Sequence, residues 1–261
     1  MTAPDSDTES APLLALTGPL ATITLNRPSR RNALNDADLQ TLIGHCTTIN
    51  AASRVRVVLI TANVRPVKPV FSAGYDVSGF DAPAARVVFA DVPDAIENLR
   101  PVTVAAMNGS VYGGSTDLGL ACDFRIGVAG MEFLMPAAKL GLHYYPSGMQ
   151  RYVSRLGLAA AKRLFLLAET LPAQTMQELG YLDQLHSADH FAAAVDATVT
   201  RLLSMAPLAS QGIKASLNEI ARGHADFGVI DARVRHALES ADFVEGRRAA
   251  AERRPPVFTG Q

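Results

Sequence analysis

Apolar and polar positions follow two different periods along the first half of the chain. The stretches ATITL (21–25) and VRVVLITA (55–62) are rich in β-branched residues. The second is apolar almost throughout, which is typical of a parallel strand covered on both faces. Between them, apolar residues recur at helical spacing: Leu39, Leu42, Ile43, Cys46 and Ile49. We therefore predict a helix there, capped by Asn35. Further along the chain we predict helices at about 84–99 and near 115–122, and strands at 101–109 and 124–129.

Beyond about residue 148 the strand pattern stops and helical spacing takes over. The predicted helices cover 158–169, 187–205, 207–222 and 228–252. No internal repeat appears in this alternation. The pattern predicts an α/β fold whose last third is helical, preceded by a polar extension over residues 1–12 that we expect to be disordered.

Composition narrows the class of protein. The chain has 261 residues, 48% of them hydrophobic, and a formal charge of −1 from 24 Lys+Arg and 25 Asp+Glu. The chain has no cluster of basic residues of the kind that binds nucleic acid. No apolar run reaches the ~18–20 residues of a membrane span. The acidic start MTAPDSDTESAP does not resemble a signal peptide, and Cys46 and Cys122 lie too far apart for a metal knuckle. We expect a cytoplasmic globular protein without a metal, a nucleic-acid partner or a membrane span.

Two glycine-containing turns are the first candidates for chemistry. SAGYD (72–76) and NGSVYGGS (108–115) each follow a predicted strand, and the second opens a helix. Small residues let the backbone approach a ligand closely, and the N–H groups at a helix start favour negative charge. Two such turns facing one point could bind an oxyanion, although such turns are more often plain connections. Neither fits the dinucleotide or phosphate-loop fingerprint.

The order and spacing of these segments resemble the enoyl-CoA hydratase/isomerase (crotonase) family. The resemblance extends over nearly all of residues 13–258 and rests on these stretches: ITLNRPSRRNAL (23–34), VVLITA (57–62), FSAGYD (71–76), PVTVAAMNGSVYGGSTDLGLACDFRI (101–126), FLMPAAKLGL (133–142), LGYLDQL (179–185) and IKASLN (213–218). It implies a spiral of ββα units over 13–200 and a helical region over 201–261 that builds homotrimers, often paired into hexamers. It also implies acyl-CoA thioester substrates, with coenzyme A as part of the substrate and no separate cofactor.

The resemblance also assigns roles to residues. The backbone N–H groups of Tyr75 and Gly114 would donate to the thioester oxygen and stabilise an enolate at Cα. Contacts to coenzyme A are implied for a set of residues around the first turn and one near the C-terminus: Arg27, Arg30, Ala33, Leu34, Ala73, Gly74, Asp76 and, reaching a neighbouring subunit's ligand, Arg253. Each arginine could equally be a solvated surface charge.

The acid–base residues depart from the pattern of the family's hydratases. Those enzymes carry one Glu after the glycine pair and a second after a later Pro, whereas this chain has Asp117 and Ala137. Asp117 could act as a single acid–base group, or it could only favour the helix dipole. His143, Tyr144 or Tyr145 could supply the missing function, while the alternative is that the tyrosines line the acyl tunnel.

Three functions are compatible with these residues. The first is an enoyl-CoA hydratase/isomerase-like enzyme working through an enolate, for which one carboxylate makes a double-bond shift easier than hydration. The second is a non-catalytic acyl-CoA-binding protein, favoured by Ala137 and opposed by Asp117. The third is a thioester hydrolase or decarboxylase, because a fold does not fix a reaction.

Overall fold

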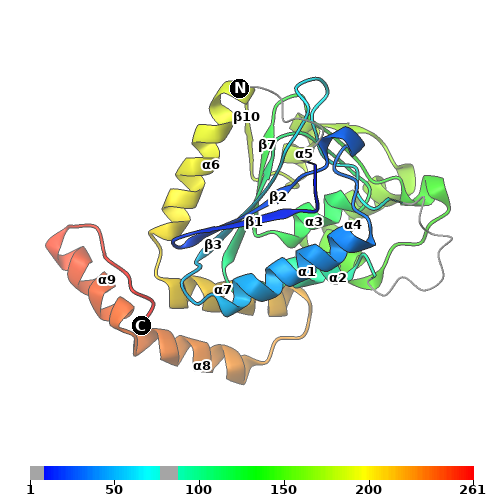
Figure 1. The fold of residues 1–261 in the computed structure, drawn as a ribbon. Helices are drawn as coiled ribbons and strands as arrows, with labels where there is room; N and C mark the ends of the chain where they lie inside the picture. Colours follow the sequence, from blue (N-terminus) through cyan, green and yellow to red (C-terminus); the bar gives the residue numbers. More distant parts are fainter. Residues whose placement is uncertain (1–8, 77–87) are drawn as a thin grey trace.

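Two β-sheets form the centre of the computed structural model, which describes residues 9–76 and 88–261 (Figure 1). The larger sheet has six strands in the order β1-β2-β3-β5-β7-β10, and the smaller has four in the order β4-β6-β8-β9. The strands of the larger sheet are β1 (Leu13–Thr17), β2 (Leu20–Leu25), β3 (Val57–Ala62), β5 (Val102–Met107), β7 (Phe124–Val128) and β10 (Gln184–His186). Those of the smaller sheet are β4 (Val70–Ser72), β6 (Ser110–Tyr112), β8 (Glu132–Leu134) and β9 (Leu171–Pro172).

Most neighbouring strands run parallel, and each sheet has one antiparallel edge strand. β2, β3, β5, β7 and β10 are parallel, with Ile60 opposite Ala105 at the centre, and β1 pairs antiparallel with β2. In the smaller sheet β4, β6 and β8 are parallel and β9 is antiparallel. β5 is buried at all six positions. β3, whose apolar run predicted a strand covered on both faces, is buried at four positions and partly buried at the other two.

Helices cover both faces of the larger sheet. The α-helices of the described residues are α1 (Asp36–Ala51), α2 (Asp91–Glu97), α3 (Ser115–Ala121), α4 (Pro146–Lys162), α5 (Ala173–Glu178), α6 (Ala188–Leu203), α7 (Pro207–Ala221), α8 (Phe227–Leu238) and α9 (Ala241–Glu252). α6 packs on one face, where Val195 and Val199 meet Val57, Val104 and Ile126. The larger core, with α1 to α4, lies on the other face.

The predicted helix after Asn35 is confirmed together with its cap. Asn35 Oδ1 accepts a hydrogen bond from Asp38 N at 3.0 Å, and Asp38 Oδ2 accepts one from Asn35 N at 3.1 Å. This reciprocal capping box satisfies two donors at the helix start. The apolar positions Leu39, Leu42 and Ile49 are buried, so the helical spacing did define the inner face.

Several predicted boundaries are wrong. Residues 228–252 form two helices, because the Ser240 side chain accepts from Phe243 N and starts α9 anew. Strands do occur after residue 148: β10 extends the larger sheet although it has only three residues. The helix predicted at about 84–99 covers only Asp91–Glu97 among the described residues, and residues 84–87 lie outside the described part. Strand β1 was not predicted.

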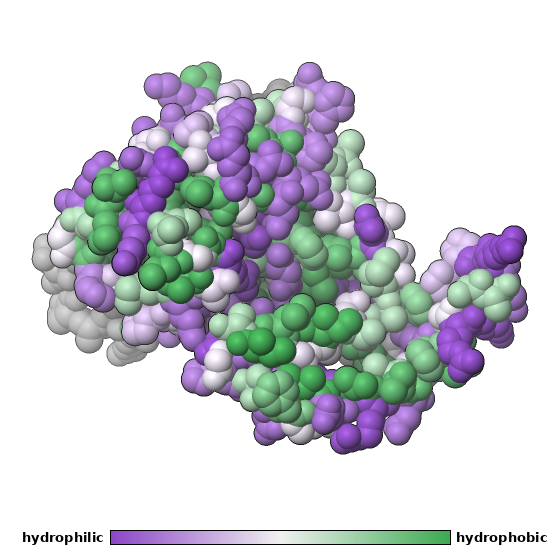
Figure 2. Space-filling view, turned by 180° about the vertical axis from the view of Figure 1, so that it is seen from behind, coloured by the Kyte–Doolittle hydropathy of each residue, from purple (hydrophilic) through white to green (hydrophobic). Residues whose placement is uncertain are grey.

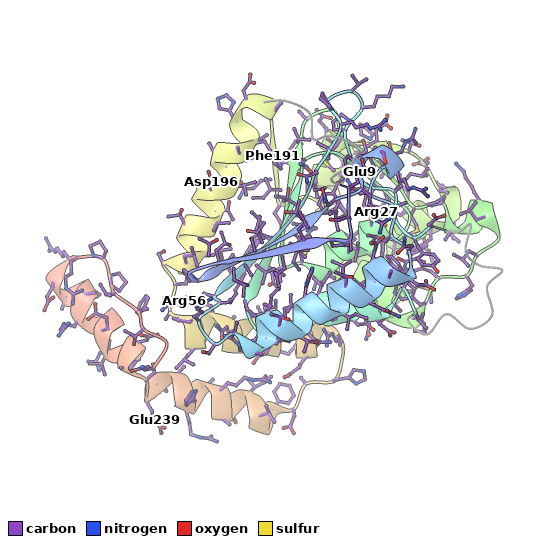
Figure 3. The ribbon with its side chains drawn as sticks, in the orientation of Figure 1. Glu9, Arg27, Arg56, Phe191, Asp196 and Glu239 are labelled. Carbon is purple, nitrogen blue, oxygen red and sulfur yellow. The ribbon has the colours of Figure 1, made fainter. Side chains whose placement is uncertain are left out.

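The C-terminal helices α8 and α9 form an arm that projects from the core (Figure 1). The tail folds back along α9, where Asp242 accepts from the backbone N–H groups of Thr259 and Gly260. Arg56 lies beside β3 (Figure 3). It donates to Phe258 O at 3.0 Å and so links the tail to the core. At the other end residues 1–8 lie outside the described part, while Ser10 N donates to Asn26 O.

None of the helices in the described ranges is both long and apolar enough to cross a membrane by itself. α6 and α7 pass the length and composition test only when joined across their 104° bend.

Candidate functional site

The first glycine turn continues β4 and is held by the segment before α1. Leu34 N donates to Gly74 O at 2.8 Å, and Asp76 N donates to Leu34 O at 2.9 Å. Because both neighbours of Tyr75 pair with Leu34, the Tyr75 N–H points to the opposite edge of β4. That edge belongs to β6, which leads into the second turn.

The second turn lies directly against the first. A Cβ on Gly74, whose φ is +85°, would lie 2.7 Å from Gly114 N and 2.7 Å from Tyr112 O. Ser115 Oγ lies 2.7 Å from Ser72 O and accepts from Tyr112 N, so one side chain joins the two turns. Within the described ranges no atom accepts a hydrogen bond from Gly114 N–H. The two predicted turns are therefore brought together, with glycine required where their backbones touch.

Three aromatic rings lie beside the two turns, those of Tyr75, Phe89 and Tyr145. The tip of the Phe89 ring lies directly against the place where a Cβ on Gly114 would be. The Phe89 ring centroid is 6.1 Å from that of Tyr75 and 6.3 Å from that of Tyr145. Phe89 thus connects the turns to Tyr145, and the Tyr75 phenol donates away from them to Asp36 at 2.6 Å.

Asp117 lies on α3, one turn after Gly114, and is fully buried. Its Oδ1 accepts from Arg151 Nε at 3.0 Å, and its Oδ2 accepts from Arg151 Nη2 at 2.8 Å. Tyr145 donates its phenolic proton to the same Oδ2 at 2.5 Å. The carboxylate therefore makes contacts beyond the start of its own helix, and Tyr145 connects it to the ring of Phe89.

The phenol of Tyr145 is held neutral by its surroundings. Burial, followed by the charge and the hydrogen bond of Asp117, raises the pKa of Tyr145 far above its usual value of about 10. Tyr144 donates to Tyr145 Oη at 3.1 Å and stacks on its ring with centroids 4.2 Å apart. The Tyr145 oxygen thus accepts one hydrogen bond and donates one to Asp117, and the second of its two lone pairs takes part in neither contact.

The other candidates for the missing acid lie outside this cluster. Ala137 is buried at the start of a 3₁₀ turn, Ala137–Leu140. His143 is exposed, and its Nδ1 lies 2.8 Å from Tyr144 O. The structure brings Tyr145 to Asp117 and leaves His143 at the surface.

The residues expected to contact coenzyme A fall into two groups. Most lie around the first turn: Arg27, Arg30, Ala33, Leu34, Ala73, Gly74 and Asp76. Arg27 Nη2 forms an ion pair with Asp38 at 3.0 Å beside the start of α1 (Figure 3), while Arg30 is exposed. Arg253 lies at the end of α9, far from the turns within one chain (Figure 1).

Three residues of the cluster were missed from the sequence. Arg151 forms an ion pair with Asp117, and Glu97 forms one with Arg151. Gly148 leaves room for the two tyrosines, because a Cβ there would lie 2.5 Å from the Tyr144 ring and 2.7 Å from the Tyr145 ring. A signal existed in PSGMQRYVSR: residues 148, 151, 152 and 155 share one face of a helix. Two arginines on a face with Tyr152 indicate buried partners.

No metal site is found in the described ranges, where no three His, Cys, Asp or Glu side chains gather. Cys46 and Cys122 are buried and unbridged, and burial raises the pKa of each thiol to about 12.

Comparison with known proteins defines the class. The family model described as enoyl-CoA hydratase/isomerase matches residues 17–261. The chain is 32% identical over 256 residues to the Mycobacterium leprae protein named probable enoyl-CoA hydratase echA6, covering 92% of this chain and 95% of that protein. It is 28% identical over 248 residues to the 2,3-dehydroadipyl-CoA hydratase of Escherichia coli K12, covering 92% and 94%. The crystal structure of a family protein from Hyphomonas neptunium superposes with a TM-score of 0.87 at 28% identity, over 98% of this chain and all of that one.

The chain belongs to the enoyl-CoA hydratase/isomerase family of enzymes. The predicted α/β fold of the crotonase type is thereby confirmed.

Proposed function

We propose that this protein catalyses a double-bond shift in an enoyl-CoA thioester through an enolate. The observation that carries the proposal is the contact between the two turns at Gly74 and Gly114, with Tyr145 and Asp117 reached through Phe89. Backbone N–H groups of Tyr75 and Gly114 would donate to the thioester oxygen. Negative charge that develops on that oxygen would be stabilised by donors already in place.

Tyr145 would carry the proton in this reaction. As the Cα–H bond breaks, its proton moves to Tyr145 Oη, the phenolic proton moves to Asp117 Oδ2, and the electron pair passes to the thioester oxygen. The negative charge of Asp117 is thereby transferred to the enolate. Returning the proton to Cγ by the reverse path completes the shift and restores the carboxylate.

A single acid–base group suits a double-bond shift better than hydration. Adding water across the double bond needs one group to activate water and one to protonate Cα, and Ala137 provides neither. In an allylic shift the same group removes and returns the proton. Tyr145 with Asp117 is one such group.

A second candidate function is acyl-CoA binding without turnover. The observation that favours it is the enclosure of Asp117, which is fully buried and has both of its oxygens paired with Arg151. In that case the turns would hold the thioester and no proton would move.

Turnover assays separate the two functions. The protein is incubated with trans-2-enoyl- and 3-enoyl-CoAs of several chain lengths, and the conjugated thioester and the products are followed. We expect conversion of 3-enoyl to 2-enoyl thioesters, with kcat reduced ~10²–10⁴-fold in both Tyr145→Phe and Asp117→Asn. Tyr112→Phe is the matched control, because its phenol donates to Glu132 instead. Tight binding of every thioester without conversion would establish the binding protein.

The residues expected to contact coenzyme A remain part of the proposal. Arg27, Arg30 and the first turn would hold the nucleotide and pantetheine of the same chain, and Arg253 that of a neighbouring subunit. Arg30→Ala should raise KM several-fold and leave kcat unchanged.

We also propose that α7 to α9 build a homotrimer or a hexamer. An apolar groove of about 650 Å³ runs between these helices, and Ile213, Leu217 and Val234 are exposed along it. Figure 2 shows this hydrophobic surface below the core and along the arm. A patch of this kind marks an interaction surface, and sedimentation equilibrium would give the number of subunits.

A further inference from the structure

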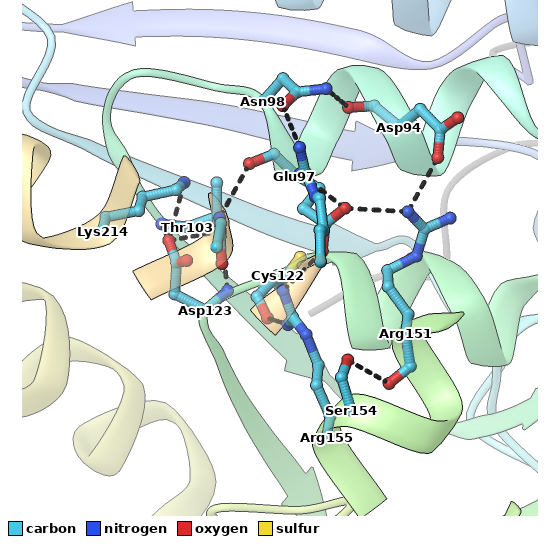
Figure 4. A network of polar contacts seen from close by, with 12 residues as sticks. Asp94, Glu97, Asn98, Thr103, Cys122, Asp123, Arg151, Ser154, Arg155 and Lys214 are labelled. Atoms are coloured by element: carbon cyan, nitrogen blue, oxygen red, sulfur yellow. Dashed lines mark hydrogen bonds and ion pairs between the residues drawn. The ribbon is translucent and has the colours of Figure 1, made fainter. Parts of the chain in front are cut away.

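Arg151 makes the strongest set of polar contacts near the candidate site. It lies on α4, six residues after Tyr145, and its side chain is 3% exposed. Two of its nitrogens bind the two oxygens of Asp117, and the third, Nη1, binds Asp94 at 2.8 Å and Glu97 at 3.0 Å. Figure 4 shows its guanidinium beside Asp94 and Glu97.

The partners of Arg151 on α2 hold it in a fixed place. Glu97 is 6% exposed and forms further ion pairs with Arg155 at 3.0 Å and with Arg222 at 2.7 Å. Arg151 is thus bound to α2 on one side and to α3 on the other. A planar guanidinium whose three nitrogens are all hydrogen-bonded is fixed in one orientation. A lysine ammonium, which is not planar, would not fix its partners in this way.

This geometry decides which way the Asp117 carboxylate faces. A bidentate pair fixes the plane of the carboxylate as well as its distance. Oδ2 accepts hydrogen bonds from both Arg151 Nη2 and the Tyr145 phenol, while Oδ1 accepts one from Arg151 Nε. The direction of the Tyr145 proton therefore depends on Arg151.

We infer that Arg151 is a positioning residue, which acts through Asp117 to direct the Tyr145 phenol proton to the carboxylate and leave the phenol oxygen turned to the substrate. This inference rests on the proposed function, because it assigns a step in the proton transfer. It extends that function to a residue that does not touch the substrate.

The matched control is Arg155, which lies one turn further along the same helix. Arg155 shares Glu97 with Arg151 and donates to Cys122 O at 2.7 Å, and among the described residues it makes no hydrogen bond or ion pair with Asp117. Arg155→Met therefore disturbs the same ion-pair cluster and spares the carboxylate. If the ion-pair cluster has only a structural role, the two substitutions should lower kcat equally. If Arg151 positions Asp117, only Arg151→Met should lower kcat.

The first test is steady-state kinetics on a 3-enoyl-CoA. Arg151→Met should lower kcat at least tenfold with KM unchanged, and Arg155→Met should leave kcat within twofold. The double variant Arg151→Met/Asp117→Asn should be no slower than Asp117→Asn alone, since residues that act through one another are not additive. Additive losses, or an equal loss in Arg155→Met, would overturn the inference.

A second variant guards against a failure to fold. Arg151→Lys keeps the positive charge and removes the fork, so the protein should fold and kcat should still fall at least tenfold. Full activity in Arg151→Lys would show that charge alone suffices, and positioning would be rejected.

A spectroscopic readout works even without turnover. Fluorine NMR of protein carrying 3-fluorotyrosine assigns the Tyr145 resonance by its loss in Tyr145→Phe. That resonance should shift in Arg151→Met and stay in place in Arg155→Met. If the wild-type protein converts no thioester, the proposed function fails, while this shift still tests the placement of Tyr145. An unmoved resonance in Arg151→Met would refute the inference by itself.

Discussion

The two halves of the candidate site are built in different ways. The turns at Gly74 and Gly114 consist of backbone, and the hydrogen bonds that hold them link residues 31–34, 72–76 and 110–115. The half around Asp117 consists of side chains from α2, α3 and α4 held by charge. The first half depends on the absence of side chains, and the second on their exact pairing.

This difference explains why one half follows the family pattern and the other departs from it. A backbone donor tolerates any side chain that leaves the turn in place, as Tyr75 does. An acid–base group tolerates no such freedom, because its reach and its partners both matter. Where the family's hydratases are expected to carry a Glu–Glu pair, this chain has Asp117 and Ala137, and the contacts of Asp117 are with Tyr145 and Arg151.

Among the substitutions that test this comparison, Gly74→Ala should have the largest effect. Its Cβ would press on backbone atoms at 2.7 Å, so the turns must separate. We expect kcat to fall at least ~10²-fold, as when an oxyanion donor is removed. Gly130→Ala is the control, since its φ of +86° matches the φ of Gly74 while nothing lies within 4 Å. Equal losses in both variants would mean that backbone strain, and not the contact between the turns, is decisive.

Gly148→Ala disturbs the other half in the same way. Its Cβ would meet the rings of Tyr144 and Tyr145 and lie 3.0 Å from Asp117 Oδ2. Overpacking of this kind costs ~1–3 kcal/mol, and we expect kcat to fall about tenfold as Tyr145 moves. Gly212→Ala, on α7 with its nearest contact at 3.7 Å, should keep full activity. Unchanged kcat in Gly148→Ala would remove Tyr145 from the proton transfer.

Gly114→Ala tests whether the turns tolerate a side chain that leaves their backbone in place. Its Cβ meets the tip of the Phe89 ring, which can move. The substitution should cost ~1–3 kcal/mol in unfolding free energy, with kcat reduced less than in Gly74→Ala. Adding Phe89→Ala should recover part of that cost in a double-mutant cycle. No coupling between the two positions would contradict the packing of Phe89 on the second turn.

The smallest effect concerns stability at alkaline pH. The pKa of each of the six tyrosines is raised, that of Tyr75 to about 12 by its hydrogen bond to Asp36 and that of Tyr145 mainly by burial. The unfolded chain ionises its tyrosines near pH 10, so their contribution to stability is complete below pH 10 and is lost as pH rises toward the folded-state values. Urea midpoints at pH 8, 10 and 11 should fall mainly in the last interval. Tyrosinate absorbance that rises near pH 10 without unfolding would contradict this.

The fold and the turns were predictable from the sequence for a physical reason. The β-branched runs, the Asn35 cap and the glycines of 72–76 and 108–115 determine local backbone geometry, and that geometry depends on residues adjacent in the sequence. Arg151 and Glu97 are different, because Arg151 meets Asp117 on α3 and Glu97 on α2 only once three helices have packed. The sequence pattern marks Arg151 as a charge on a buried helix face, but it does not name the partner.

Exchange of the Cα proton tests the enolate mechanism most directly. A saturated acyl-CoA is incubated with the protein in D2O, and deuterium at Cα is followed by NMR, so that enolate formation is seen without any assumption about the product. We predict exchange by the wild-type protein and a loss of at least ~10²-fold in Tyr145→Phe. Binding of the thioester with no exchange, or exchange that survives the loss of the Tyr145 hydroxyl, would contradict this mechanism.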